Sequence, residues 1–146
     1  MAKVYKNVLV ATDGSKEANN AFKKAANLAA NGGDDAKLVI THIVDTPSLE
    51  SMGGYDKKFI EKITKDSKES LNELKKKAEN IGVKNIETDL EYGSPKQLIA
   101  YKVPKDKNID LLVIGATGLN GFEKLLIGSV TSFAVRNAVT DVLVTK

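Results

Sequence analysis

The chain contains no cysteine and no tryptophan, one histidine (His42) and one arginine (Arg136). The absence of cysteine excludes disulfide bonds, cysteine-ligated zinc, iron–sulfur clusters and a cysteine nucleophile. A single histidine excludes a metal site with several imidazole ligands. The scarcity of arginine counts against a DNA-reading protein, because guanidinium groups make most bidentate contacts to bases and phosphates.

Aromatic residues make up only 5%, and the net charge is +3, from 22 basic and 19 acidic residues. Neither value favours a nucleic-acid surface. No apolar run approaches the ~18 residues of a membrane-spanning helix, and no signal peptide is recognisable at the amino end. We therefore expect a cytoplasmic protein that binds neither nucleic acid nor membrane. With 42% apolar and 28% charged residues, the 146-residue chain is expected to fold as one domain, residues 1–146.

Apolar runs alternate with amphipathic segments along the whole chain. We predict five strands, at residues 7–12, 38–44, 84–91, 110–114 and 142–144. Four helices are predicted between them: one capped by Ser15, one from Lys57 to Gly82, one from Ser94 limited by Pro104, and one capped by Ser129 that ends near Asn137. Residues 45–56 are expected to be a loop. Strict alternation predicts a single doubly wound, parallel α/β sheet with helices on both faces.

In such sheets, ligands bind outside the carboxyl ends of the strands. The stretch after the fourth predicted strand contains Gly115 and Gly118, then nine residues, then Gly128 and Ser129. Glycines let a phosphate approach the backbone, and a helix N-terminus offers unpaired amides. Ser129 and Thr131 could add hydroxyl donors. Neither a Walker loop nor a dinucleotide fingerprint is present. On spacing alone, it is equally plausible that the glycines merely form a turn and start a helix.

Asp13 follows the first strand, where a carboxylate can accept hydrogen bonds from ribose hydroxyls. Taken alone, it is better explained as a turn residue bonded to its own backbone. His42 lies inside the second strand without a partner motif, and we assign it no catalytic role. The lysine-rich helix after Lys57 also carries acidic residues, which is typical of a solvated face.

Four features occur together in this chain: the first strand running into residues 11–15, Thr41-His42-Ile43-Val44-Asp45, Gly93-Ser94-Pro95, and the glycine spacing from Asp110 to Ser129. Together they resemble the universal stress protein family over nearly the whole chain. The resemblance implies strand order 3-2-1-4-5 and, because the glycines are present, membership of the ATP-binding subgroup. It also implies a homodimer formed through the last strand, residues 142–144, which would otherwise be an exposed edge.

The resemblance also implies a set of nucleotide-contacting residues. Those near the adenine and ribose are Ala11, Thr12, Asp13 and Ile43, and Ile114 closes the adenine slot. Those that hold the phosphates are Gly115, Gly118, Gly128, Ser129 and the backbone of Val130 and Thr131.

The chain departs from the family pattern at two places. Ala116 and Thr117 stand where many members have serine and then a basic or histidine residue. We therefore expect Mg²⁺ or Mn²⁺ to bridge the phosphates, with Lys124 as a candidate substitute charge. Asp141 stands where members often have proline before the last strand, which puts the geometry of the dimer contact in question.

The function implied is an ATP-binding regulatory module in stress responses, with slow or no hydrolysis. No catalytic residue and no metal-ligating residue is assigned, although Glu123 is a carboxylate in the glycine loop that could be tested. One alternative is an adenine-nucleotide hydrolase or transferase on the same fold. Residues 12–15 do not match the Ser-Gly-Gly-x-Asp-Ser loop of pyrophosphatase-type relatives, which counts against it. Another alternative is a nucleotide-free dimeric interaction domain.

Overall fold

The computed structural model describes residues 4–13, 15–53, 56–116 and 127–146. They contain one parallel sheet of five strands with the order β3-β2-β1-β4-β5. The strands are β1 (Asn7–Thr12), β2 (Lys37–Val44), β3 (Asn85–Tyr92), β4 (Leu111–Gly115) and β5 (Asp141–Thr145). The predicted fold class and the strand order implied by the family resemblance are both confirmed.

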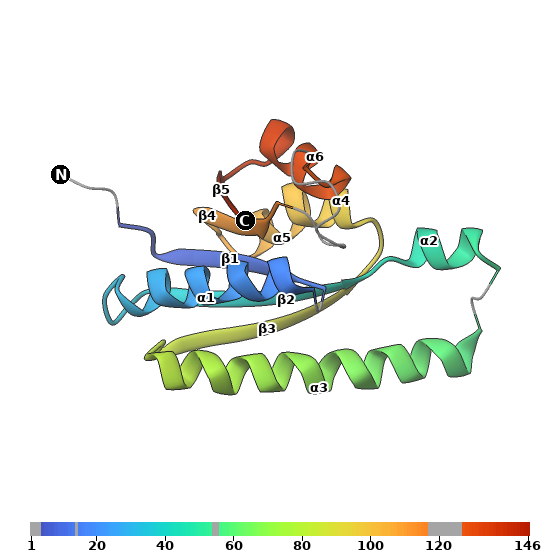
Figure 1. The fold of residues 1–146 in the computed structure, drawn as a ribbon, viewed down its shortest axis with the longest axis horizontal. Coiled ribbons are helices and arrows are strands. Elements are labelled where there is room, and N and C mark those ends of the chain that lie inside the picture. Colours follow the sequence, from blue (N-terminus) through green and yellow to red (C-terminus); the bar gives the residue numbers. More distant parts are fainter. Residues whose placement is uncertain (1–3, 14, 54–55, 117–126) are drawn as a thin grey trace.

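Helices cover both faces of the sheet (Figure 1). One face carries α1 (Lys16–Ala30) and α3 (Lys57–Ile81). The other carries a continuous helix and α6 (Ser129–Asn137). The continuous helix comprises α4 (Pro95–Gln97), the π-helical turn η1 (Leu98–Lys102) and α5 (Val103–Asp106).

The period-two alternation of the central strands divides the core into two layers. Val8 and Val10 of β1 pack toward α1 and α3, whereas Leu9 between them packs toward the opposite helices. All three are fully buried. Near the carboxyl end of the sheet, successive residues of one strand likewise point to opposite faces of the sheet.

Local signals explain the boundaries of the two long helices. The Ser15 hydroxyl accepts a hydrogen bond from the Ala18 amide at 3.1 Å and so caps α1, as predicted. The Asp56 carboxylate accepts the Phe59 amide at 2.8 Å at the start of α3. Gly82 ends α3 with φ +113, a conformation that residues with a Cβ rarely adopt.

The prediction of a loop at residues 45–56 is wrong in its first half. A short helix, α2 (Thr46–Ser51), begins there because the Asp45 carboxylate accepts the Ser48 amide at 3.1 Å. Pro47 lies in its first turn, where a missing amide hydrogen costs little. None of the α2 residues is buried, so no apolar periodicity marked it in the sequence.

The expected end of the third helix at Pro104 is also wrong, because this helix continues to Asp106. Proline cannot donate to the carbonyl four residues earlier, and its ring crowds that carbonyl. The turn widens here into η1, and the Val139 amide donates to the Ala100 carbonyl at 3.1 Å instead. At the start of this helix, Ser94 makes no side-chain capping bond, contrary to the predicted capping box.

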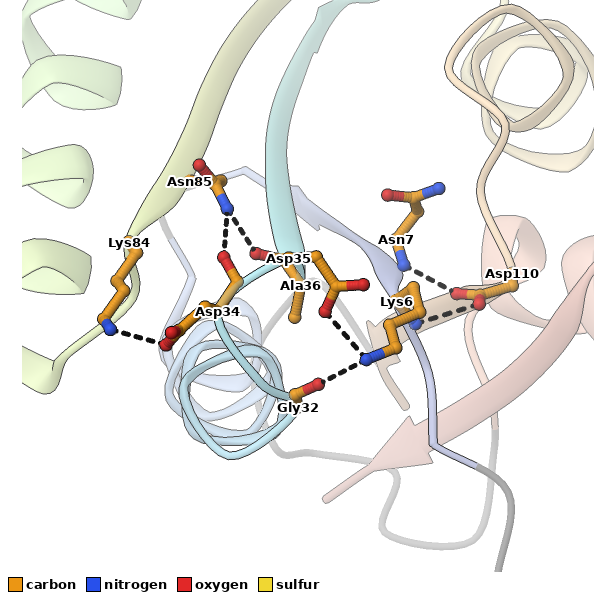
Figure 2. Close-up of polar contacts among 9 residues, drawn as sticks. All are labelled: Lys6, Asn7, Gly32, Asp34, Asp35, Ala36, Lys84, Asn85 and Asp110. Carbon is orange, nitrogen blue, oxygen red and sulfur yellow. Dashed lines mark hydrogen bonds and ion pairs between the residues drawn. The ribbon is translucent and has the colours of Figure 1, made fainter.

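A polar network joins the loops at the amino end of the sheet (Figure 2). The Asp110 carboxylate accepts the amides of Lys6 and Asn7, each at 2.9 Å, and so connects β1 to the start of β4. The Lys6 ammonium donates to the Gly32 carbonyl at 2.9 Å and pairs with Asp35 at 2.8 Å. These contacts stabilise the end of the sheet opposite to the candidate site.

Candidate functional site

A cavity of about 460 Å³ opens at the carboxyl ends of β1, β2 and β4. Its volume lies within the range of ~300–1,000 Å³ that is usual for small-molecule sites. It sits where the strand order reverses between β1 and β4, the position at which open α/β sheets bind ligands. The sheet topology therefore places the cavity beside the carboxyl ends of the strands that flank the reversal.

One part of the cavity wall is apolar. Ala11, Ile43 and Ile114 come from the ends of three strands and belong to the layer on the α4–α6 side. Pro95 and Ile99 face them from the continuous helix. Apolar side chains arranged around such an opening can hold a flat, weakly polar ring.

The N-terminus of α6 forms the opposite part of the wall. The Gly128 amide donates to the Ala116 carbonyl at 2.8 Å, which brings the two described ends of the glycine stretch together. The next three amides, of Ser129, Val130 and Thr131, have no acceptor among the described residues. Unpaired amides at the positive end of the helix dipole attract anions, so this wall suits a phosphate group.

Gly115 has a packing role. A Cβ at this position would lie 3.0 Å from the backbone carbon and oxygen of Glu17 in α1. The glycine therefore lets α1 approach β4 closely, and the need for glycine does not by itself indicate a ligand.

Thr131 also differs from the expectation that its hydroxyl is available to a ligand. The side chain is 4% exposed, and its hydroxyl donates to the Gly115 carbonyl at 2.7 Å. The hydroxyl is therefore already used within the protein. Only the backbone amide of Thr131 remains as a donor toward the cavity.

Two carboxylates line the cavity, Asp13 and Asp45. One oxygen of Asp13 accepts the Ser15 amide at 2.9 Å, which forms the local turn proposed as its alternative role. The Asp45 carboxylate caps α2 through Ser48. Each carboxylate is thus oriented by the backbone and keeps a second oxygen for other partners.

Every predicted site residue that the structure describes lines this cavity. Gly118 lies outside the described residues, as do Thr117, Glu123 and Lys124. Sequence reasoning missed five lining residues: Ser15, Ala18, Asp45, Pro95 and Ile99. Asp45 directly follows a strand and could have been found by the rule that ligands bind at strand ends; Pro95 and Ile99 depend on how the helices pack.

The part of the chain that the structure describes contains no group of three or more His, Cys, Asp or Glu side chains placed to hold a metal ion. None of its helices is long and apolar enough to cross a membrane.

A sequence profile of the Universal stress protein family matches residues 4–146. A Staphylococcus aureus (strain USA300) protein named as a universal stress protein is 44% identical over 142 residues, which cover 97% of this chain and 84% of that protein. The structure of the universal stress protein UspA from Lactobacillus plantarum superimposes with a TM-score of 0.83 at 29% identity, covering 99% of this chain and 100% of that one. A universal stress protein crystallised with cAMP superimposes with a TM-score of 0.70 at 27% identity, covering 99% and 98%.

Proposed function

Because this chain belongs to the universal stress protein family, we propose that its cavity binds an adenine nucleotide, specifically ATP. The protein then acts as a nucleotide-dependent regulatory module in stress responses. We assign it to the ATP-binding subgroup of the family and to the cytoplasm, where ATP and Mg²⁺ are both available.

One observation carries this proposal: a single cavity combines an apolar slot with three unpaired helix amides. The adenine ring lies between Ala11, Ile43 and Ile114. The phosphate chain lies against the amides of Ser129, Val130 and Thr131, where the α6 dipole favours negative charge. The phosphate chain can pass close to Gly128 because glycine has no side chain.

The ribose lies between these two regions. The Asp13 oxygen that does not bind Ser15 accepts a ribose hydroxyl, as carboxylates do at the same position in other α/β nucleotide sites. The wall contributes backbone dipoles but no described lysine or arginine to the phosphates. A Mg²⁺ or Mn²⁺ ion held chiefly by the phosphates then balances their charge.

The relative crystallised with cAMP supports the choice of adenine. Its bound ligand shares the adenine and ribose of ATP, and it is similar to this chain over almost the full length. The proposal extends from that ligand to ATP because the α6 amides offer more anion-binding capacity than one cyclic phosphate needs.

Hydrolysis is proposed to be slow or absent. The two described carboxylates in the cavity, Asp13 and Asp45, each already bind a backbone amide, in a local turn and in the cap of α2, and Asp13 is assigned to the ribose. A nucleotide that persists can shift the population between two protein states, as a regulatory module requires.

We further propose that two copies pair through β5, the strand at one edge of the sheet. Apolar side chains are exposed near this edge: Val135 is 52% exposed and Val139 is 63% exposed. Pairing would cover unsatisfied edge groups and these side chains together.

The test is isothermal titration calorimetry with ATP and MgCl₂, with AMP, cAMP and GTP titrated in parallel. We expect ATP to bind with a dissociation constant in the micromolar range or tighter, and GTP to bind more weakly. No heat of binding at about millimolar ATP would refute the proposal. Chromatography of the same samples over hours then measures hydrolysis, and turnover at ordinary enzymatic rates of about 1 per second or more would favour the hydrolase alternative.

A further inference from the structure

Strand β3 carries three carboxylates on one face of the sheet. Glu87, Asp89 and Glu91 alternate with other residues along the strand, and side chains two residues apart in a strand point to the same side. Lys102 of η1 lies near Glu91, and Lys107, directly after α5, pairs with Glu87. The carboxylates therefore lie on the face that carries the continuous helix.

Glu87, nearer the amino end of β3, is closely paired. Its carboxylate binds the Lys37 ammonium of β2 at 2.6 Å and also the ammonium of Lys107. Hydrogen bonds from Lys107 and Lys37 hold the pKa of Glu87 below its ordinary value of 4.5. Glu87 and its two lysines therefore stay charged to a lower pH than an isolated glutamate would.

Glu91 has a looser contact with a cation. The Lys102 ammonium lies 3.7 Å away, too far for a hydrogen bond, and donates instead to Asp106 at 3.0 Å. The Asp89 carboxylate, two residues earlier, is held in place by the hydroxyl of the fully buried Thr41 at 2.8 Å. Burial and the nearby Asp89 raise the pKa of Glu91, and Lys102 offsets this only in part. Glu91 therefore takes up a proton at a higher pH than Glu87 does.

Glu91 also lies beside the apolar slot of the candidate site. It pairs in register with Ile43 of β2, which lines that slot, and residues in register have side chains on the same face. On the helix side, Lys102 belongs to the same π-helical turn, η1, as Ile99, which lines the cavity. The contact between Glu91 and Lys102 thus joins the strand beside one wall of the slot to the turn that carries the other wall.

A second contact joins β3 and η1 at the same place. After Glu91 the chain turns at Gly93, whose amide donates to the Val44 carbonyl at 3.0 Å, and then runs to the continuous helix (Figure 1). A Cβ at Gly93 would lie 3.3 Å from Cδ1 of Leu98 in η1. A change of charge at Glu91 therefore acts where β3 and η1 already touch.

We propose that Glu91 is a positioning residue for the apolar slot, which acts through Lys102 on η1 and releases η1 when it takes up a proton from solvent. The charged carboxylate attracts the Lys102 ammonium and draws η1, with Ile99, toward β3. The protonated carboxyl loses this attraction and donates its hydrogen to Asp89, while Lys102 keeps Asp106.

The expected effect on ligand binding is modest. Lys102 is 57% exposed, and ion pairs of this kind change an equilibrium about two- to fivefold at most. The effect on binding rests on the proposed nucleotide site, whereas the response of η1 to Glu91 does not. The two are therefore tested separately.

NMR of the nucleotide-free protein tests the response of η1. The carboxyl ¹³C signals of Glu87 and Glu91 and the methyl signals of Ile99 are followed from pH 7 to pH 4. We expect the Ile99 methyl groups to titrate with the same midpoint as Glu91, above pH 4.5, and Glu87 to have its midpoint below pH 4.5. Ile99 signals that do not follow Glu91, or a Glu91 midpoint at or below that of Glu87, would overturn the proposal.

Two glutamine substitutions on β3 provide a matched comparison. E91Q keeps the shape of the side chain but never carries its charge, so the Ile99 methyl groups should no longer respond to pH in this range. E87Q, on the same face of the same strand, should leave the Ile99 titration unchanged. D89N removes the neighbouring carboxylate and should lower the Glu91 midpoint toward 4.5. An Ile99 titration that persists in E91Q would assign the movement to another group and would refute the role of Glu91.

Titration calorimetry with adenosine then tests the effect on binding, because adenosine has no phosphate that titrates in this range. Between pH 7 and pH 5, the dissociation constant of the parent should rise about two- to fivefold more than that of E91Q. An equal pH dependence in both proteins would contradict the effect on binding. If neither adenosine nor ATP binds at about millimolar concentration, the proposed function fails, and the Ile99 titration still decides the role of Glu91.

Discussion

The hydroxyl of Thr131 donates to the Gly115 carbonyl at 2.7 Å and so ties the first turn of α6 to the end of β4. Both residues line the cavity of the candidate site. Together with the bond from the Gly128 amide to the Ala116 carbonyl, this buried hydrogen bond holds the unpaired α6 amides in place relative to the strand ends.

Replacing Thr131 with valine should destabilise the fold, because it keeps the side-chain shape but removes the donor. The Gly115 carbonyl loses this partner in a buried place, at an expected cost of about 1–3 kcal/mol in the free energy of unfolding. Urea denaturation followed by circular dichroism measures the change. T131S keeps the hydroxyl and removes only the methyl group, so it should cost less; a T131V variant as stable as the parent would contradict the importance of this hydrogen bond.

Gly115 should tolerate no Cβ without a cost to stability. G115A would place a Cβ 3.0 Å from backbone atoms of Glu17, so α1 would have to move away from β4. We expect a loss of about 1–3 kcal/mol, measured by the same urea titration. An unchanged denaturation midpoint would show that α1 can shift at little cost and that the glycine has another purpose.

The strands were predictable from the sequence because each is a short, apolar or alternating run between turn residues. Helix α2 was not predictable, because none of its residues is buried and a short exposed helix leaves no periodic pattern. The continuation of the third helix through Pro104 depends on the Val139 amide, which reaches Ala100 from a distant part of the chain. No local pattern contains that information.

The residues of the candidate site also differ in how far the sequence could predict them. Residues at strand ends, such as Asp13 and Gly115, could be proposed from position and resemblance. Ile99 could not, because its place in the cavity depends on how a helix packs across the sheet. A correctly predicted residue can also have another role than the expected one. Gly115 was expected to hold phosphates, but the close approach of α1 already accounts for a glycine at this position.

Glu87 should make the protein sensitive to acid. Hydrogen bonds and charge from Lys107 and Lys37 hold the pKa of the Glu87 carboxyl below its ordinary value of 4.5. A lowered pKa adds stability that is fully present above pH 4.5 and is lost as the pH falls through the folded-state value. E87Q should therefore be less stable than the parent at pH 7, by about 1 kcal/mol or less.

This difference should shrink as the pH falls below 4.5, because the parent then loses the same charge. Thermal unfolding followed from pH 7 to pH 3 measures it. E79Q, at an exposed position of α3, is the control and should follow the parent. A difference between E87Q and the parent that does not change with pH would contradict the assignment to charge.

The proposed pairing through β5 can be tested at its exposed apolar border. V139K places a charge on a side chain that is 63% exposed beside the edge strand. We expect multi-angle light scattering to report a dimer for the parent and a monomer for V139K. M52K changes an exposed residue just after α2, on the part of the chain that follows β2, and should remain dimeric. A monomeric parent would refute the pairing outright.

Gly128 offers the sharpest test of nucleotide binding, because its backbone conformation does not require glycine. Its φ of −59 and ψ of 157 are open to any residue, so a side chain there can fill the cavity without straining the chain. G128V should therefore lower ATP affinity about tenfold or more, at little cost in stability. A138V adds comparable bulk at the other end of α6, outside the cavity, and should bind ATP like the parent. Because urea denaturation of both variants reports folding separately, a loss of binding in G128V alone locates the phosphates at this helix end. Retained affinity in G128V would place them elsewhere.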